Sequence, residues 1–171
     1  MLSEDEPAPS FSLPGTDGGE FEEYALAEYT EEGVAVLAFY PFDFSPVCTD
    51  ELCGFRDAEW LTLSPAVDVL GISTDACYAH RAFIDQYGLS FPLLSDTTGE
   101  VADRYGVAYE EWELHRGVSK RSVFVVDDEM TVRYAWSTDD AYDTPDLYEL
   151  HEAIRDVHDP AGAPNERDGG A

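Results

Sequence analysis

The stretch VAVLAFY-PFDFSPVCTDE, residues 34–51, decides the fold class of this chain. Its first part, Val34 to Tyr40, is continuously apolar, which is typical of a strand that is covered on both faces of a sheet. A loop with two prolines follows, and from Cys48 onward the apolar residues have helical spacing. The stretch therefore predicts a buried strand, a loop and a helix that begins at a cysteine.

The rest of the chain extends this unit. A second apolar run at residues 67–73 predicts a parallel neighbour for the first strand. Helices are predicted over residues 48–63, 76–87 (ended by Gly88), 98–105 (ended by Gly106) and 145–157 (with Pro145 at its start). Residues 7–21 predict a short strand and turns, and residues 122–126 and 131–136 predict a hairpin. This order predicts a thioredoxin-like α/β fold, with a central mixed β-sheet flanked by helices.

Length and composition predict one domain over residues 1–158, because 171 residues can bury one full core and no composition break divides them. The remaining segment, residues 159–171, contains charge, proline and glycine but almost no apolar residues. We expect it to be a disordered acidic tail.

The net charge of −28 comes from 37 acidic and 9 basic residues, with Lys120 as the one lysine. Such a surface repels phosphate groups and argues against nucleic acid as a partner. The same charge destabilises a compact state in dilute buffer, but at ~1 M salt the screening length falls to ~3 Å. The composition therefore favours a cytoplasmic protein of a halophile, and we expect a haloarchaeal source.

Several other classes of protein are disfavoured by the sequence. The acidic start, Met1 to Glu6, does not resemble a secretion signal, and no apolar run is long enough to span a membrane. Three cysteines without a C-x-x-C pair predict neither a disulfide framework nor structural zinc. The scattered histidines show no metal-ligand spacing and are expected at the surface or an interface; they are His80, His115, His151 and His158. We therefore expect no metal and no cofactor, and redox chemistry at a cysteine.

Cys48 is the first candidate because a helix N-terminus stabilises a thiolate. Lowering the pKa of a thiol by ~2.5 units requires about 3.4 kcal/mol, whereas a helix terminus supplies about 0.3 to 2 kcal/mol. A second positive group is needed. The segment KRSVFVVD, residues 120–127, offers Arg121, whose planar guanidinium stays charged when it is buried.

Pro41, Ser45 and Cys48 match in register the active-site motif of peroxiredoxins, and Arg121 matches the family's second active-site segment. From residue 7 to residue 154 the chain resembles this AhpC/TSA family, most closely its AhpE-like and PrxQ (bacterioferritin-comigratory-protein-like) branches. The resemblance implies a thiol peroxidase that reduces hydrogen peroxide and organic hydroperoxides through a cysteine sulfenic acid. It also implies recycling by a thioredoxin- or glutaredoxin-like reductant.

The resemblance assigns roles around Cys48. It implies that the Ser45 hydroxyl and the Cys48 backbone N–H hold the peroxide, while Pro41 shields the thiolate from water. Most relatives carry Thr where this chain has Ser45, which leaves the rotamer less constrained. Glu51 also matches the family pattern. A carboxylate so near opposes thiolate formation unless it orients Arg121 or caps the first turn, which is the role predicted for it.

The resolving cysteine has two candidates in the sequence. Cys53 stands where PrxQ-like proteins often carry theirs, and Cys77 is the alternative. In an intact helix, five residues rise ~7.5 Å and leave two side chains ~140° apart, beyond the ~7 Å Cα separation that a disulfide tolerates. Resolution by Cys53 therefore requires the helix to unwind. An external thiol or an intermolecular disulfide is the other route, and a homodimer is a candidate assembly.

Two other functions compete with the peroxidase. A thioredoxin-like disulfide oxidoreductase needs a C-x-x-C pair, which the spacing of Cys48 and Cys53 does not provide. A non-enzymatic holdase or redox-sensing protein would expose an apolar face only when oxidised. Peroxide consumption without added reductant, insulin reduction, or neither would separate the three.

Overall fold

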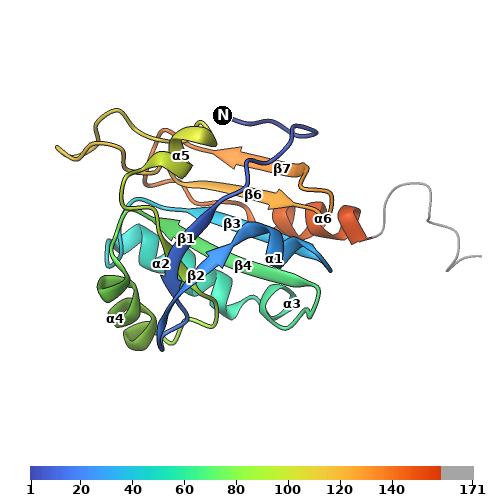
Figure 1. The fold of residues 1–171 in the computed structure, drawn as a ribbon, viewed down its shortest axis with the longest axis horizontal. Coiled ribbons are helices and arrows are strands. Elements are labelled where there is room, and N and C mark those ends of the chain that lie inside the picture. The colour runs from blue at the N-terminus through green and yellow to red at the C-terminus, as the bar shows by residue number, and fades with distance from the viewer. Residues whose placement is uncertain (159–171) are drawn as a thin grey trace, which may run out of the picture.

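The computed structural model describes residues 1–158, and its centre is a seven-stranded mixed sheet (Figure 1). Two central strands, β3 (Val34–Phe39) and β4 (Val67–Ser73), run parallel, with Val34 beside Val67 and Phe39 beside Ile72. Every residue of β3 is buried, because both faces of the sheet are covered. The strand–helix–strand unit predicted from the sequence is therefore confirmed.

The strand order across the sheet is β2 (Phe21–Ala25), β1 (Ser12–Thr16), β5 (Leu93–Ser95), β4, β3, β6 (Ser122–Val126) and β7 (Val132–Ser137). Strands β3, β4 and β5 run parallel to one another, and the remaining four pairs are antiparallel. The predicted C-terminal hairpin is present as β6 and β7. The N-terminal region, for which one strand was predicted, forms a hairpin of two. The predicted thioredoxin-like α/β fold is confirmed.

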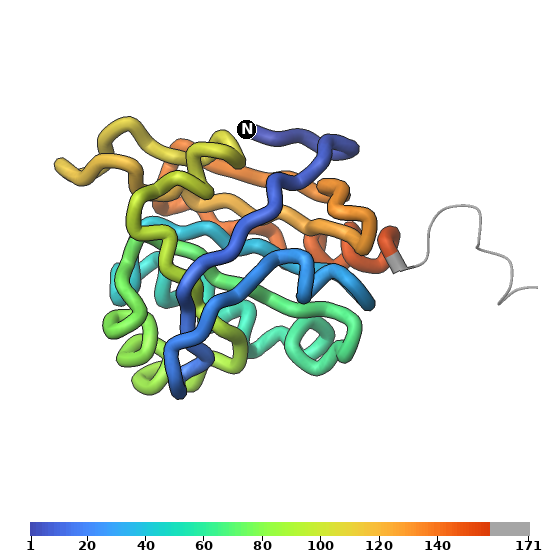
Figure 2. The backbone as a smooth tube through the Cα atoms, viewed as in Figure 1, coloured from blue at the N-terminus to red at the C-terminus, as the bar shows by residue number. Residues whose placement is uncertain are grey.

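Helices and the N-terminal segment cover the two faces of the sheet and enclose two apolar clusters. Helices α2 (Pro46–Asp57), α3 (Glu59–Thr62), α4 (Cys77–Tyr87) and α6 (Leu147–His158) contribute to one cluster. The other contains α1 (Leu26–Thr30), α5 (Glu100–Arg104) and the N-terminal segment. That segment runs past α5 and β7 (Figure 2), with backbone hydrogen bonds from Leu2 to Tyr105 and from Asp5 to Val132.

Several predicted helix boundaries are wrong for local reasons. The helix predicted over residues 48–63 begins at Pro46, two residues before Cys48, because proline is well suited to the first helical position, and it breaks at Ala58, which has extended backbone and packs into the core. The helix predicted from residue 98 begins at residue 100, because Gly99 is left-handed with φ 73°. The last helix begins after Asp146, whose Oδ1 accepts hydrogen bonds from the N–H groups of Tyr148 and Glu149 at 2.8 and 3.2 Å.

Two further predictions concern the ends of the chain and the membrane. The segment predicted to be a disordered tail, residues 159–171, lies outside the described residues. Within residues 1–158, no helix combines the length and the apolarity needed to cross a bilayer.

Candidate active site

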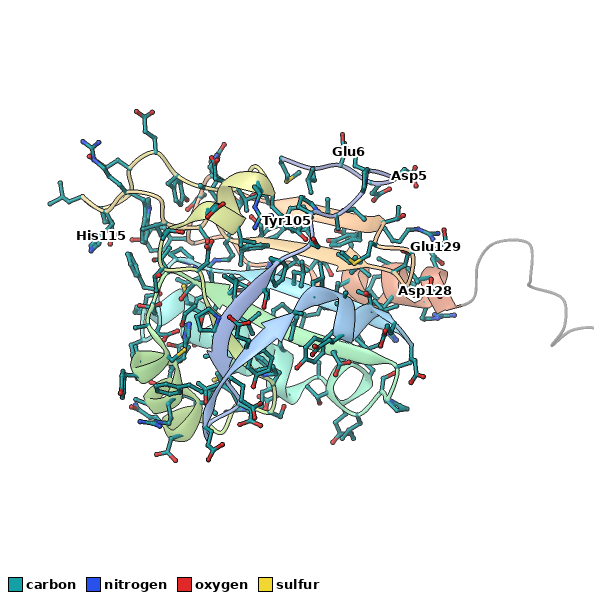
Figure 3. The ribbon with its side chains drawn as sticks, viewed as in Figure 1. Asp5, Glu6, Tyr105, His115, Asp128 and Glu129 are labelled. Atoms are coloured by element: carbon teal, nitrogen blue, oxygen red, sulfur yellow. The ribbon has the colours of Figure 1, made fainter. Side chains whose placement is uncertain are left out.

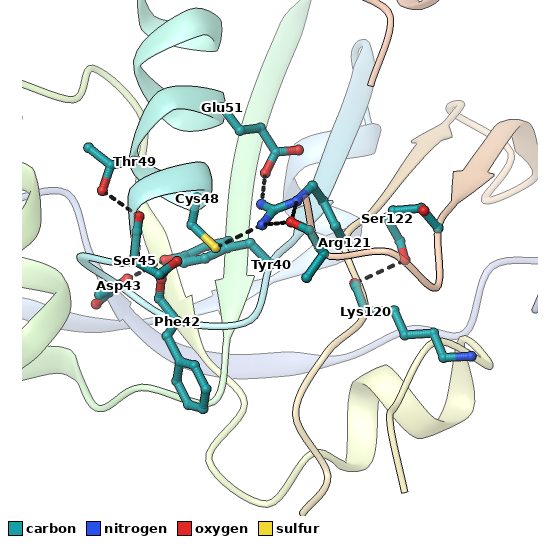
Figure 4. A network of polar contacts seen from close by, with 12 residues as sticks. Tyr40, Phe42, Asp43, Ser45, Cys48, Thr49, Glu51, Lys120, Arg121 and Ser122 are labelled. Atoms are coloured by element: carbon teal, nitrogen blue, oxygen red, sulfur yellow. Dashed lines mark hydrogen bonds and ion pairs between the residues drawn. The ribbon is translucent and has the colours of Figure 1, made fainter. Parts of the chain in front are cut away.

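Cys48 and Arg121 meet at the edge of the sheet where β3 ends and β6 begins. The antiparallel register pairs Phe39 with Ser122, so Arg121 enters β6 beside the point where the chain leaves β3. The loop over residues 40–45 then leads into α2, whose first turn contains Cys48. The Arg121 Nη2 donates to the Cys48 Sγ at 3.2 Å (Figure 4). The structure thus brings together the two residues that the sequence predicted as partners.

Arg121 is only 1% exposed, and its guanidinium is held on more than one side. Its Nη1 donates to Glu51 Oε1 at 2.8 Å, and its Nε and Nη2 donate to the Ala141 carbonyl oxygen at 3.2 and 2.9 Å. Glu51 lies three residues after Cys48 on α2, so both side chains project from the same face of the helix. Figure 4 shows the guanidinium between the thiol and the carboxylate. Such a fixed fork leaves the charge little freedom to move away from the sulfur.

Burial is the largest influence on the Cys48 thiol and raises its pKa above the ordinary value. The Arg121 guanidinium, the Ser45 side chain and the Phe42 backbone each lower this pKa, but together they do not outweigh burial. The sequence predicted a lowered pKa and is wrong for this closed arrangement, because the thiol is completely removed from solvent. Without the arginine, the thiolate would be less favourable still.

Glu51 is the second buried acid that shares Arg121. Burial raises the pKa of its carboxyl to about 7, although Arg121 acts in the opposite direction. Among residues 1–158, Glu51 Oε2 has no hydrogen-bond partner. One guanidinium therefore faces two acids that become charged above neutral pH, and ionisation of one makes ionisation of the other less favourable.

Ser45 and Pro41 lie in the loop that leads to α2. Pro41 is buried directly after Tyr40, and Ser45 is half-buried at the position before the helix. The Ser45 hydroxyl donates to the Phe42 carbonyl oxygen at 3.2 Å. A cavity of about 130 Å³ opens beside Ser45 and Arg121, and its wall includes Trp112 and Tyr142. There is space for a small molecule next to the arginine.

All three cysteines are free thiols. Cys53 is half-buried on the same continuous helix as Cys48, so the geometry that forbids a direct disulfide applies. Cys77 is buried at the first position of α4, where its Sγ lies 3.4 Å from Ser95 Oγ. Cys53 would have to move to reach Cys48.

A buried polar cluster beneath the loop was missed in the sequence. His80 is completely buried, which contradicts its predicted place at the surface or an interface. It contacts Asp43, which in turn contacts Tyr40 and Asp75. One signal could have revealed the burial, because His80 shares a helix face with Phe83 and Ile84. Its partner Asp43 is 37 residues away, and nothing in the spacing indicates the contact.

Known proteins resemble the chain in sequence and in structure. A model of the AhpC/TSA family matches residues 5–135. A protein of Coxiella burnetii assigned as peroxiredoxin bcp is 42% identical over 133 residues, which cover 75% of this chain and 84% of that protein. Peroxiredoxin tpx1 of Schizosaccharomyces pombe is 36% identical over 134 residues, covering 74% and 67%. The crystal structure of peroxidoxin BcpB from Mycobacterium tuberculosis superimposes with a TM-score of 0.78 at 28% identity, covering 92% and 99%.

Proposed function

The chain belongs to the AhpC/TSA family and is a thiol peroxidase, and we propose that Cys48 is its peroxidatic cysteine, with Arg121 as the group that stabilises the reacting charge. The observation that carries this assignment is the 3.2 Å contact between Arg121 Nη2 and Cys48 Sγ in the first turn of α2. The alternatives, a disulfide oxidoreductase and a non-enzymatic holdase, are not favoured by the relatives, which are peroxiredoxins.

In the proposed step, the Cys48 thiolate donates an electron pair to the terminal oxygen of a hydroperoxide. The S–O bond forms while the O–O bond breaks, and the leaving alkoxide or hydroxide takes up a proton to become alcohol or water. Arg121 stabilises the negative charge as it moves from sulfur to the leaving oxygen. The Ser45 hydroxyl and the Cys48 backbone N–H orient the peroxide, and Pro41 limits access of water.

The substrates we propose are hydrogen peroxide and organic hydroperoxides. The cavity of about 130 Å³ beside Ser45 and Arg121 accommodates a small organic group, and the Trp112 and Tyr142 side chains give it an apolar wall. Incubation of the reduced protein with hydrogen peroxide or cumene hydroperoxide tests the function. We expect about one equivalent to be consumed per Cys48 without reductant, with trapping of a sulfenic acid on that residue. Absence of both signals with either peroxide would contradict the proposal.

For recycling, we propose that Cys53 resolves the sulfenic acid and that a thioredoxin- or glutaredoxin-like protein reduces the resulting disulfide. Since α2 is continuous through both cysteines, its first turns must unwind for the bond to form. Hydrogen exchange across residues 47–55 should therefore rise on oxidation, and Cys53→Ser should stop at the sulfenic acid. A disulfide map that links Cys48 to Cys77, or normal turnover of Cys53→Ser with thioredoxin, would contradict local unwinding. Cys77→Ser is the matched control.

We also propose that the protein works in the cytoplasm of a halophile. Support comes from the net charge of −28 and from acidic side chains such as Asp5, Glu6, Asp128 and Glu129, which lie on the outside of the molecule (Figure 3). Screening of this repulsion should raise the melting temperature when KCl is increased from ~0.1 M to above ~1 M. A flat melting temperature over that range would contradict the halophilic assignment.

A further inference from the structure

The cluster beneath the loop joins three elements through side chains that the peroxidase chemistry does not use. His80, on α4, places its Nδ1 2.7 Å from Asp43 Oδ2 and its Nε2 3.0 Å from the Leu94 carbonyl oxygen. Asp43 belongs to the loop over residues 40–45, and Leu94 belongs to β5. Both side chains of the central contact are at most 1% exposed. A contact so deeply buried is isolated from solvent and from salt.

The two neighbours of the imidazole determine where its protons lie. A backbone carbonyl can only accept, so the Nε2 facing Leu94 carries a proton. Asp43 already accepts a hydrogen bond at Oδ1 from the Tyr40 hydroxyl at 2.6 Å, so Oδ2 faces Nδ1 as the second acceptor of the carboxylate. An imidazolium paired with an Asp43 carboxylate would give both ring nitrogens an acceptor.

We propose that this His80–Asp43 ion pair is a positioning device that holds the loop over residues 40–45 against Cys48. The proposal rests on the peroxidatic role of Cys48. Phe42 and Ser45, on either side of Asp43, supply the backbone and hydroxyl groups that favour the Cys48 anion. Anchoring Asp43 to α4 therefore fixes the groups that face the sulfur, although His80 itself does not touch it.

The loop contains strain that makes an anchor necessary. Phe44, directly after Asp43, has a left-handed backbone with φ 69°, which is costly for a bulky residue. Its side chain is 44% exposed, and its ring packs 4.9 Å from that of Phe83 on α4. The backbone N–H of Asp43 also donates to Asp75 Oδ2 at 2.8 Å. The loop is thus held at two neighbouring residues, Asp43 and Phe44.

Other titratable groups face the pair from two elements. Tyr40, after β3, donates to Asp43, and burial raises the pKa of its phenol well above the ordinary range, so it remains a neutral donor. Asp75, after β4, accepts from the Ser73 hydroxyl at 2.6 Å. Asp43, Asp75 and His80 place ligand-type atoms within 4.8 Å of one another, but the hydrogen bonds of the cluster already engage those atoms. The hydrogen bonds account for the arrangement of these side chains.

A double-mutant cycle of His80→Gln, Asp43→Asn and the double variant tests the pair. His80→Gln leaves the Asp43 carboxylate buried without its counter-charge, whereas Asp43→Asn with His80→Gln leaves two neutral amides. We expect the rate constant for oxidation of Cys48 to fall ~10-fold in His80→Gln and to recover to within ~3-fold of wild type in the double variant. Reduction of the oxidised enzyme should be unaffected. His151→Gln, on α6, is the control and should match wild type.

A purely packing role predicts additive losses, so a double variant slower than His80→Gln would overturn the proposal. In case the single variant does not fold, nitrogen NMR of the intact wild-type protein gives a separate test. Both ring nitrogens of His80 should be protonated at neutral pH, because both face acceptors. An unprotonated ring nitrogen would overturn the proposal, as would tight zinc binding that His80→Gln abolishes. Absence of peroxide consumption by wild type would instead refute the proposed function.

Discussion

Two cysteines of this protein occupy nearly the same position in the fold and differ in what faces them. Each lies in the first turn of a helix that follows a central parallel strand: Cys48 in α2 after β3, and Cys77 in α4 after β4. Both side chains are buried, with exposures of 0% and 9%. Cys48 receives a hydrogen bond from Arg121 at 3.2 Å, whereas Cys77 lies 3.4 Å from the Ser95 hydroxyl.

A position at a helix N-terminus does not by itself distinguish the two thiols, because both cysteines have it. A helix terminus typically contributes about 0.3 to 2 kcal/mol to a nearby anion, and at Cys48 burial outweighs this and raises the pKa of the thiol. The difference between the sites comes from β6, which delivers Arg121 to one thiol only, and from Glu51 and Ala141, which fix the orientation of the arginine.

The strongest test of this comparison replaces each sulfur separately. Cys48→Ser should lose at least ~1000-fold in peroxidase turnover, because a serine hydroxyl provides almost no anion at neutral pH. Cys77→Ser should stay within ~2-fold of wild type, because serine fills a similar volume and no charged group depends on that sulfur. Steady-state peroxide consumption with a thiol reductant measures both. Residual activity of Cys48→Ser above a tenth of wild type would contradict the assignment of Cys48 as the reacting cysteine.

The next test changes the arginine and leaves the sulfur in place. Arg121→Lys should lower kcat/KM for peroxide ~100-fold, or about 2.7 kcal/mol, because an ammonium cannot contact the sulfur, the peroxide and Glu51 together. It should also raise the pKa of Cys48, measured from the thiolate absorbance, because the point charge is less well placed. Arg155→Lys on the exposed face of α6 is the control. Unchanged kcat/KM and unchanged thiol pKa would remove Arg121 from the site.

The fold and the central contact of the site were predictable because their signals are local. The apolar run over residues 34–40 is typical of a buried strand, and the positions of Pro41, Ser45, Cys48 and Arg121 follow from matched motifs. The strands and helices that were not predicted are short, and packing against neighbouring elements, rather than their own sequence pattern, stabilises them. Strand β5 has three residues, and helix α1 has five.

The net pKa of Cys48 and the cluster around His80 could not be predicted for a different reason. Both depend on burial and on contacts between distant segments, which a one-dimensional pattern does not contain. Motif matching places an arginine near a thiol, but the depth of burial that opposes the charge is a property of the packed structure.

The smallest expected effect concerns Glu51, the carboxylate that holds Arg121 beside Cys48. At Cys77 the contact is with the Ser95 hydroxyl instead. Glu51→Gln keeps an oxygen that can accept from Arg121 but removes the negative charge. The pKa of the Glu51 carboxyl is raised to about 7, so in wild type the carboxylate forms as the pH rises through neutrality and opposes the Cys48 thiolate. The variant should therefore have a lower thiol pKa and react with peroxide ~2- to 3-fold faster above pH ~7, with little difference below it.

Rapid mixing with peroxide across this pH range measures the effect, with Glu152→Gln on α6 as the control. A variant that is slower at every pH would contradict this prediction. It would show that the charge of Glu51 helps the reaction by orienting Arg121 more than it hinders the reaction by repelling the Cys48 thiolate.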